Sequence, residues 1–449
     1  MPTGAHRPAR GLASTLAAFV ASVLVGVVAV LLPVGPASAS NVVTPGNFTG
    51  YGFDQCTAPT QAAMDAWLSS SPYWAVGIYI SGDSRYCTEQ PNLTPAWVDT
   101  QLANGWRLLP ITLGPQAWCT TRQRYLKQVR ISPDDTDGYA KARAQGRAEA
   151  SKTVSAAKAL GMAARSTMWY DIEAFDISRT KCRESALSFL SAWTRKLHKL
   201  HYVSGIYSSG ASGIKMLDDA QTNRPGKYTM PDQIWIGDWN GVANVSSKYL
   251  RPDSWLPGGR VHQYRGGHDE THGGVTINID NDFLDLGTGS VARRATRHCG
   301  GVDVDFANYP TVRAGTRSPL VSAAKCLLTE RGLFSGSLSQ TYGPRLARAV
   351  NKYRIDNGLS AGPDLTRRTW MVLTTEGSRP LVKYGAASSA VRRLQRALNA
   401  AAATNRLEIT GTFERTTMRA VKAYQKTRGL RATGVVTDSL WALIHAGRR

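Results

Sequence analysis

The sequence predicts a mixed α/β fold: a TIM-like (β/α)8 barrel with some outer helices missing, followed by two small all-α modules of three helices each. Two observations indicate this class. Short apolar segments recur with turn or helix signals between them from residue 42 to residue 286, as expected for strands buried in a parallel sheet. Residues 299–447 repeat themselves at spacings of 70 and then 71 residues. A chain of 449 residues is also too long for one ordinary core.

The N-terminal segment indicates export. Residues 1–10 carry two arginines and no acidic residue, residues 12–32 are almost wholly apolar, and Ala37-Ser38-Ala39 is a small-x-small motif. This pattern predicts a signal peptide that is cleaved after its first 39 residues. The alternative is an uncleaved anchor, because the apolar run approaches membrane-spanning length, but Pro33 and Pro36 before the motif favour cleavage. The two arginines are not adjacent, so we expect a Sec-type signal and a secreted, wall-associated protein.

The cysteines support this compartment. An even number of cysteines in an exported chain predicts three disulfides, and none has the CxxC spacing of a metal site. Cys299 and Cys326 flank the start of the C-terminal region, so we expect them to pair with each other. The remaining four allow three connectivities, which the sequence leaves open; they are Cys56, Cys87, Cys119 and Cys182.

A barrel domain is predicted over residues 45–290. Helical composition identifies residues 138–160 and 183–200 as outer helices, whereas the gaps after the sixth and seventh strands hold no full-length helix. The eight candidate strands are Thr49–Asp54, Trp74–Ile80, Trp106–Leu113, Thr167–Glu173, Tyr202–Tyr207, Gln233–Trp239, Arg260–Tyr264 and Thr276–Asp280.

Polar and aromatic residues gather where these strands end. Because catalysis in such barrels takes place at the carboxyl ends of the strands, these residues are candidates for a site. They are Asp54, Tyr79, Asp171, Glu173, Tyr207, Asp238, Trp239, Gln263, Tyr264, Asp280 and Asp282.

The most specific chemical feature is the DxE pair in Trp169-Tyr-Asp-Ile-Glu-Ala-Phe175. Alternation along a strand points Asp171 and Glu173 to the same side. Two carboxyl groups that close repel each other's charge, so one of them keeps its proton near neutral pH. Glycoside hydrolysis needs such a pair, one acid for the leaving oxygen and one carboxylate for the cationic centre. The alternative is a polar strand end that holds loop amides or an arginine.

Short motifs recur along the predicted barrel in the order Gly52-Phe-Asp-Gln55, Tyr170-Asp-Ile-Glu173, Gly205-Ile-Tyr-Ser208, Trp235-Ile-Gly-Asp-Trp239, His262-Gln-Tyr264 and Ile279-Asp-Asn-Asp-Phe283. This set resembles the DxE muramidases of glycoside hydrolase family 25. Two further motifs are Phe53-Asp-Gln-Cys-Thr-Ala-Pro59 and Gly77-Ile-Tyr-Ile-Ser-Gly82. With them, the overall likeness is greatest to the actinobacterial glycoside-hydrolase-like domains of unknown function (the 1906 type), and it covers nearly all of residues 45–290.

This resemblance implies roles for individual residues. Glu173 would be the general acid and Asp171 would stabilise the substrate acetamido group or oxocarbenium centre, with Asp54 and Asp280 tuning the pair. An acetamido-assisted route and a direct nucleophile both suit a DxE pair and stay open. Tyr79-Ile-Ser-Gly82 departs from the muramidase pattern, which has a further polar residue there. The substrate-binding residues would be Tyr79, Tyr207, Asp238, Trp239, Gln263 and Tyr264.

A second motif, His268-Asp-Glu-Thr-His272, suggests a metal site at first sight. A zincin needs HExxH on a helix, so that both imidazoles share one face. Here the order is HDExH and glycine pairs flank it, which predicts a flexible rim loop that contacts substrate. We therefore expect neither a metal nor another cofactor.

The C-terminal region divides into repeat 1 (residues 299–376) and repeat 2 (residues 379–447). Each unit has apolar positions that share one face in each of three short helices. The aligned pairs are Pro310 with Pro380, Gly315 with Gly385, Val321 with Val391, Tyr342 with Phe413, Tyr353 with Tyr424, and Trp370 with Trp441.

Repeat 2 resembles the peptidoglycan-binding domain 1 family in Ser389-Ala-Val-Arg-Arg-Leu-Gln-Arg-Ala-Leu398 and in the segment from Thr412 to Gln425. Repeat 1 is degenerate, with Ala324 and Lys325 in place of Leu394 and Gln395. The resemblance implies that these modules hold a hydrolase against peptidoglycan. The alternative is a generic helical bundle with a solvated basic face.

Charge indicates the kind of partner. The formal net charge is +22, and the chain from Cys299 onward holds 24 Lys and Arg against 9 Asp and Glu. Such an excess suits an anionic partner; export argues against nucleic acid and favours peptidoglycan and anionic wall polymers. We expect a monomer without stable membrane insertion after signal cleavage.

Together these features predict a secreted cell-wall glycan hydrolase with muramidase-like activity. Two other functions stay open. The barrel would bind wall glycan without cleaving it and serve as a scaffold, or it would hydrolyse a different envelope polysaccharide.

Overall fold

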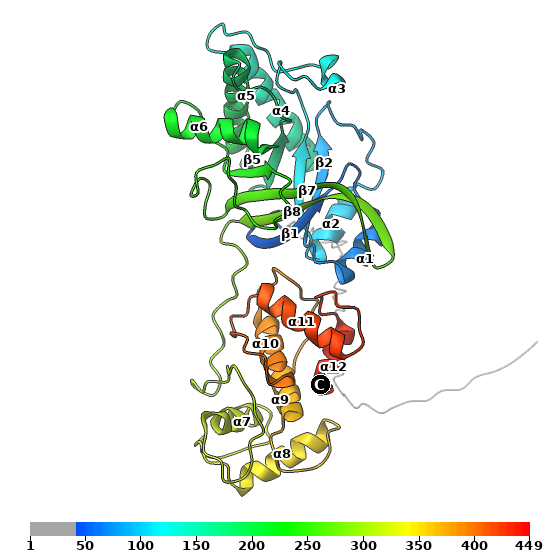
Figure 1. Ribbon diagram of the computed structural model, residues 1–449, viewed down its shortest axis with the longest axis vertical. Coiled ribbons are helices and arrows are strands. Elements are labelled where there is room, and N and C mark those ends of the chain that lie inside the picture. The colour runs from blue at the N-terminus through cyan, green and yellow to red at the C-terminus, as the bar shows by residue number, and fades with distance from the viewer. Residues whose placement is uncertain (1–41) are drawn as a thin grey trace, which may run out of the picture. The chain divides into compact units, whose positions relative to one another are not determined.

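The computed structural model describes residues 42–449, so the predicted signal peptide lies outside the described residues (Figure 1). In that part of the chain, no helix has both the length and the apolar character that a membrane crossing requires.

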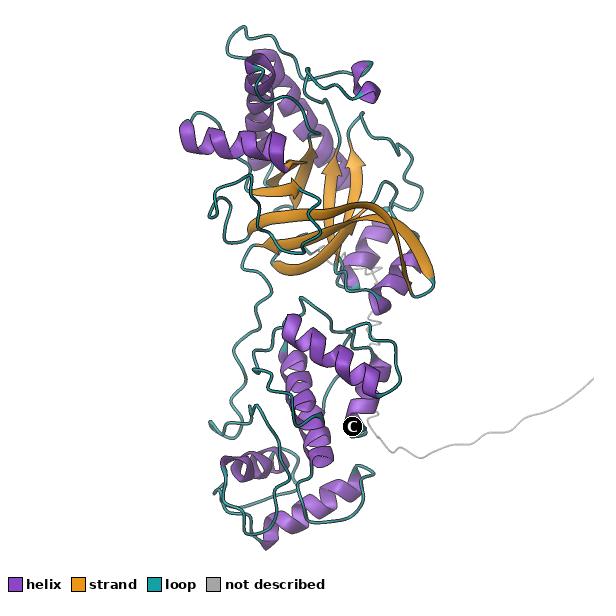
Figure 2. Ribbon diagram, in the orientation of Figure 1, coloured by secondary structure: helices purple, strands orange, loops and turns teal. Residues whose placement is uncertain are grey.

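Eight strands close into a barrel in chain order, which confirms the predicted fold class (Figure 2). The first seven run parallel to one another. The strands are β1 (Phe48–Asp54), β2 (Ala75–Ser81), β3 (Arg107–Thr112), β4 (Thr167–Asp171), β5 (Val203–Ser209), β6 (Gln233–Gly237), β7 (Gly259–His272) and β8 (Val275–Leu286).

The last strand differs from the prediction. β8 is antiparallel to both β7 and β1, because only Gly273 and Gly274 separate it from β7, and a parallel crossover needs a dozen or more residues. Both glycines have positive φ, 59° and 81°, as the tight turns of two-residue hairpins require. The expectation of a flexible rim loop at residues 268–272 is therefore wrong, because these residues belong to β7.

Helices cover the outside of the barrel. They are α1 (Gln61–Ser70), α2 (Pro95–Ala103), α3 (Gln123–Leu126), α4 (Ala140–Ala159), α5 (Thr180–Lys199) and α6 (Lys215–Asn223), the last preceded by the π-turn η1 (Gly210–Ile214). The two predicted helices, α4 and α5, are confirmed and lie side by side (Figure 1). Gly146 permits this approach, since a Cβ there would lie 2.2 Å from the Phe189 carbonyl oxygen.

Large apolar side chains fill the barrel below the candidate site. Trp169 and Trp235 are almost completely buried and meet edge to face, with ring centroids 5.5 Å apart. Leu109, Val261 and Leu284 belong to the same cluster. The interior is therefore a packed core, and ligands can reach polar groups only at its carboxyl end.

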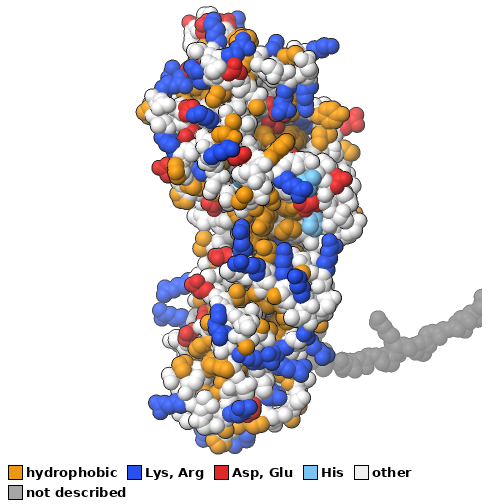
Figure 3. All heavy atoms as spheres, in the orientation of Figure 1, with side chains coloured by type: hydrophobic (Ala, Val, Ile, Leu, Met, Phe, Trp, Pro, Cys, Tyr) orange, Lys and Arg blue, Asp and Glu red, His pale blue; other side chains and the backbone are white. Residues whose placement is uncertain are grey.

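The C-terminal region contains the two predicted three-helix repeats. Equivalent hydrogen bonds confirm the internal repetition, because the Trp370 indole donates to the Pro310 carbonyl and the Trp441 indole donates to the Pro380 carbonyl. Lys and Arg side chains are numerous on the surface of this region (Figure 3). Repeat 1 comprises α7 (Pro319–Thr329), α8 (Pro344–Asp356) and α9 (Arg367–Thr375), and repeat 2 comprises α10 (Ser389–Ala401), α11 (Arg415–Thr427) and α12 (Asp438–His445).

All six cysteines are paired. The predicted Cys299–Cys326 bond is confirmed. Of the three connectivities left open for the barrel, the structure has Cys56–Cys87 and Cys119–Cys182.

Candidate active site

A pocket of about 390 Å³ opens at the carboxyl end of the barrel, within the size range of ligand sites. A smaller pocket adjoins it, and Asp54, Tyr79, Asp171, Glu173 and Asp280 line both. The four carboxylates predicted from separate strand ends therefore do lie together.

Asp280 does not lie at the end of its strand, where the sequence predicted it. It lies in the middle of β8, where the antiparallel register places it opposite Asp54 of β1. Gln263 of β7 donates from Nε2 to both carboxylates, at 2.8 Å to Asp54 and 3.2 Å to Asp280. On β2, a Cβ at Gly77 would lie 2.4 Å from the Cβ of Asp54, so a glycine is needed beside this pair.

The orientation of the Gln263 amide is fixed from its other end. Its Oε1 accepts hydrogen bonds from the Tyr207 hydroxyl and the Trp239 indole, both at 2.9 Å. Since both partners are donors, Oε1 must face them, and the NH2 group must face the carboxylates. Gln263 thereby couples two aromatic residues of the pocket to the acidic pair.

Burial and mutual repulsion keep protons on this group of acids. Burial, followed by the charge of Asp280, raises the pKa of Asp54 to about 8. Burial also raises the pKa of Asp280 to about 6, although His268 opposes the shift. The pair therefore carries less than two negative charges near neutral pH.

Asp282 is a further acid in this cluster, and it is the strand-end candidate to which the resemblance assigns no role. It is fully buried, and its Oδ1 accepts from the Trp235 indole at 2.9 Å. Burial, then Asp54 and Asp280, raise its pKa well above the usual range. The alternation in Asp280-Asn-Asp282 was the signal, since it places both aspartates on one face of the strand.

Asp171, the last residue of β4, forms the floor of the pocket. Its Oδ2 accepts from the Tyr79 hydroxyl at 3.3 Å, and its Oδ1 has no hydrogen-bond partner among the described residues. Burial, then the charges of Glu173 and Asp54, raise the pKa of Asp171 well above its usual value. Burial and the neighbouring charges thus favour the protonated form of Asp171.

Glu173 lies just beyond the end of β4, in a different environment. Its Oε2 pairs with the Arg122 guanidinium at 2.8 Å, and its Oε1 accepts from the Tyr125 hydroxyl at 3.2 Å. Its side chain is 22% exposed and that of Arg122 is 52% exposed. Both contacts suit an ionised carboxylate.

Arg122 and Tyr125 belong to residues 116–131, which we call the rim segment. It leaves and rejoins the barrel where Gln116 and Arg130 form a β-bridge. The Gln116 side chain also holds the DxE backbone, donating to the Asp171 carbonyl and accepting from the Glu173 amide. This segment has no periodic pattern of apolar residues, so Arg122 and Tyr125 are not predictable from the sequence as part of the site.

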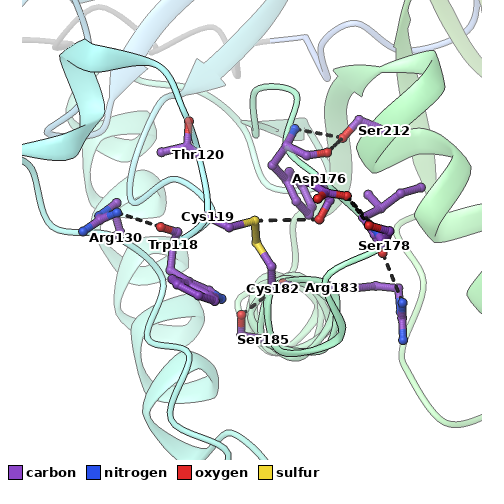
Figure 4. The surroundings of a disulfide bond; sticks show 12 residues. Trp118, Cys119, Thr120, Arg130, Asp176, Ser178, Cys182, Arg183, Ser185 and Ser212 are labelled. Atoms are coloured by element: carbon purple, nitrogen blue, oxygen red, sulfur yellow. Dashed lines mark hydrogen bonds between the residues drawn. A yellow bond between two sulfur atoms is a disulfide. The ribbon is translucent and has the colours of Figure 1, made fainter.

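The Cys119–Cys182 disulfide anchors the rim segment to α5. Figure 4 shows the bond between Cys119 in the segment and Cys182 on the helix, with the Arg130 side chain donating to the Trp118 carbonyl at 2.7 Å. Arg122 lies three residues from this anchor. The backbone that carries Arg122 is thus anchored near the pocket by covalent as well as hydrogen bonds, whereas its side chain stays half-exposed.

Two predicted substrate-binding residues lie outside both pockets. Tyr264 follows Gln263 in β7, and successive side chains of a strand point to opposite faces. Asp238 precedes Trp239, and its carboxylate accepts from Asn240 at 3.4 Å. In contrast, Tyr79, Tyr207, Trp239 and Gln263 do line the site.

The His268–His272 motif forms a polar cluster on the β7–β8 hairpin. Glu270 accepts from His268 at 3.0 Å, from His272 at 2.9 Å and from the Tyr73 hydroxyl at 2.8 Å. Although burial opposes it, the hydrogen bonds of His272 and His268 hold the pKa of Glu270 at about 2. The His272 ring also packs edge to face on Trp67 of α1, so the motif fastens the hairpin to that helix.

Comparison with known families agrees with this architecture. Residues 65–284 match the family described as "Rv2525c-like, glycoside hydrolase-like domain". The barrel is an Rv2525c-like, glycoside hydrolase-like domain. Residues 387–444 match the family described as "Putative peptidoglycan binding domain", which covers repeat 2. The protein thus joins a glycoside hydrolase-like domain to a peptidoglycan-binding one. No curated protein matches the sequence.

Solved structures similar to the glycoside hydrolase-like domain include the Tat-secreted protein Rv2525c of Mycobacterium tuberculosis. It is 12% identical, with a TM-score of 0.34, and the match covers 53% of this chain and 96% of that one. A family 25 glycosyl hydrolase from Bacillus anthracis is 13% identical, with a TM-score of 0.32 and coverage of 56% and 94%. An uncharacterized protein of B. stearothermophilus is 16% identical, with a TM-score of 0.32 and coverage of 52% and 95%. At these values none of them informs the chemistry of the site.

Proposed function

We propose that the barrel is a secreted wall glycan hydrolase that cleaves glycosidic bonds of peptidoglycan in the manner of a muramidase. The observation that carries this proposal is the pair Asp171 and Glu173, which line one pocket in unlike environments. Glycosidases separate the roles of two carboxyl groups by such a difference.

Glu173 is placed to act as the general acid. It is the more exposed of the two, at the edge of the pocket where a leaving oxygen can approach it. Asp171 lies on the floor, where it would orient an acetamido group or stabilise the oxocarbenium centre. Asp54 and Asp280, held by Gln263, would bind the sugar and set the charge around the pair.

The ion pair with Arg122 bears on this assignment. A carboxylate that accepts from a guanidinium has no proton to give, so Glu173 serves as an acid only after Arg122 leaves it. A barrel in which the ion pair persists would bind glycan without cleaving it. This geometry is the specific observation that favours the scaffold as a second function.

The C-terminal repeats supply the attachment to the wall in this proposal. In repeat 2, Gln395 holds the loop before α11, accepting from the Gly411 amide and donating to Thr410, Thr412 and Thr417. A groove of about 560 Å³ lies beside it, lined by Asn405, Arg406, Glu414 and Arg419 among others. Peptidoglycan, with anionic wall polymers drawn by the net charge, would be the ligand, at an extracellular location that suits the disulfides.

The decisive experiment digests purified cell walls with the mature protein and identifies the reducing ends that are released. We expect muramic acid ends from the parent and a loss of about 100-fold or more in rate for Glu173→Gln, the usual contribution of a general acid. Sedimentation with walls serves as the control for binding. Tight sedimentation without release of any fragment would support the scaffold instead.

A further inference from the structure

Three arginines surround the mouth of the site on the side of the rim segment. Arg122 lines the smaller pocket, and Arg85 and Arg124 line the larger one. Two of them are fixed by backbone carbonyls: Arg124 donates to Ser84 at 2.6 Å, and Arg85 donates to Gly82 at 3.0 Å. Among the described residues, the Arg122 side chain instead has one hydrogen-bond or ion-pair partner, the Glu173 carboxylate.

The acids below do not cancel this positive charge. Burial raises the pKa of Asp171 and of Asp54, whereas Asp280, with a pKa of about 6, keeps most of its charge at pH 7. The three guanidinium groups stay charged and outnumber the charged carboxylates of Asp280 and Glu173. Among the acids lining the pocket, Glu173 is the one already paired with an arginine. The mouth therefore presents a positive potential to an approaching ligand, although the exposed acid Asp83, paired with Lys152, lies two residues before Arg85.

We infer that the site takes a glycan that carries an anionic oxygen group, a carboxylate or a phosphate, beside the bond to be cleaved, and that Arg122 transfers from Glu173 to this group when the glycan binds. The inference rests on the proposed function of the same pocket. Guanidinium groups bind carboxylate and phosphate in the same forked geometry, so both belong to one ligand chemistry. Arg122 is the residue that would determine specificity.

The transfer has a chemical consequence. While Arg122 contacts Glu173, the raised pKa of Asp171 favours Asp171 as the member of the DxE pair that holds a proton. Once Arg122 pairs with the substrate anion, that proton can move from Asp171 to Glu173, and the total charge of the pair stays at −1. An anionic substrate would thereby create the general acid that cleaves it, and a neutral glycan would leave Glu173 paired with arginine.

Binding can be measured with tetrasaccharides of alternating N-acetylglucosamine and N-acetylmuramic acid. One has free lactyl carboxylates, the second has them as neutral carboxamides, and the third adds a 6-O-phosphate to the neutral form. We expect the parent protein to bind at least one anionic form about tenfold or more tightly than the neutral form by calorimetry, the usual size of a charge-assisted contact. The anionic form that binds more tightly than the neutral form shows whether the recognised group is a carboxylate or a phosphate.

Arg122→Gln should abolish this preference, whereas Arg147→Gln should retain it. Arg147 is exposed on α4 and does not line either pocket, so it controls for the loss of one charge. Thermal melting should be the same for both variants, since both side chains are exposed. Equal affinity of the parent for all three ligands, or an unchanged preference in Arg122→Gln, would overturn the inference.

Measurements of turnover test this inference and the proposed function separately. If the parent binds anionic ligands preferentially and cleaves none of them, the hydrolase function fails and the ligand class stands. If it cleaves the neutral and anionic forms with equal kcat/KM, the function stands and the role of Arg122 fails. In an active parent, the discrimination in kcat/KM between the two forms should fall to about one in Arg122→Gln.

Discussion

The floor and the rim of the pocket place a carboxyl group in opposite environments. Asp171 on the floor is buried, with one carboxyl oxygen lacking a partner among the described residues, and its pKa is raised. Glu173 at the rim is partly exposed and held by an arginine and a tyrosine. Two residues of separation are enough, because β4 ends at Asp171 and the chain turns outward after it. Chemical role in such a pair depends on environment more than on residue type.

The source of each environment also differs. The floor consists of strand residues, so neighbouring strands and the packed core fix its geometry. The rim depends on a loop that is held by a β-bridge, by Gln116 and by the Cys119–Cys182 bond. Substitutions in the floor should therefore alter both chemistry and stability, and substitutions in the rim should have a much smaller effect on stability.

The largest effect is expected from Asp171→Asn. The amide keeps the shape of the side chain but cannot be ionised, so kcat/KM for wall digestion should fall by about 10²–10⁴-fold. The same change should raise the melting temperature at pH 7, because it removes a buried group whose ionised form opposes folding. Asp238→Asn, outside both pockets, is the matched control and should stay within about twofold of the parent. An active Asp171→Asn would contradict the division of roles.

The pH dependence of stability tests the floor directly. The pKa of Asp54 is about 8 in the folded protein and near 4 in an unfolded chain. Between these values the folded state binds more protons, so the free energy of unfolding falls as pH rises. In Asp54→Asn, the decrease between pH 5 and pH 8 should shrink by an amount on the order of 3–4 kcal/mol, measured by urea unfolding. Asp219→Asn, at a half-exposed position of α6, should leave the decrease unchanged. An equal change in both variants would show that the floor is not the source of the pH dependence.

The smallest effect is expected at the rim from Tyr125→Phe. It removes one hydrogen bond to Glu173 and leaves Arg122 in place, so kcat/KM should change by no more than about fivefold. Urea unfolding should show only the modest loss that accompanies a lost hydroxyl. Tyr202→Phe removes a buried hydroxyl that donates to the Met162 carbonyl. Both residues precede the amino ends of their strands, β5 and β4, at the other end of the barrel from the site, so this change should affect stability without affecting activity. A 100-fold loss of activity in Tyr125→Phe would mean that Tyr125 itself takes part in the reaction.

The sequence by itself determined the strand order, the two outer helices α4 and α5, the DxE pair and the duplication of the C-terminal region. These features are recorded in local periodicity and in spacing, which a single chain displays directly. The Cys299–Cys326 pairing was predictable for a similar reason, since its two cysteines lie at the start of one small module.

Only the tertiary structure decided which of these residues meet and what surrounds them. The antiparallel register of β8 sets Asp280 against Asp54, the alternation of β7 turns Tyr264 away from the site, and a loop without periodicity brings Arg122 to Glu173. The Cys56–Cys87 and Cys119–Cys182 pairings also needed the fold. The physical reason is that burial, ion pairing and disulfide geometry depend on distances between segments far apart in the chain, and those distances are set by packing.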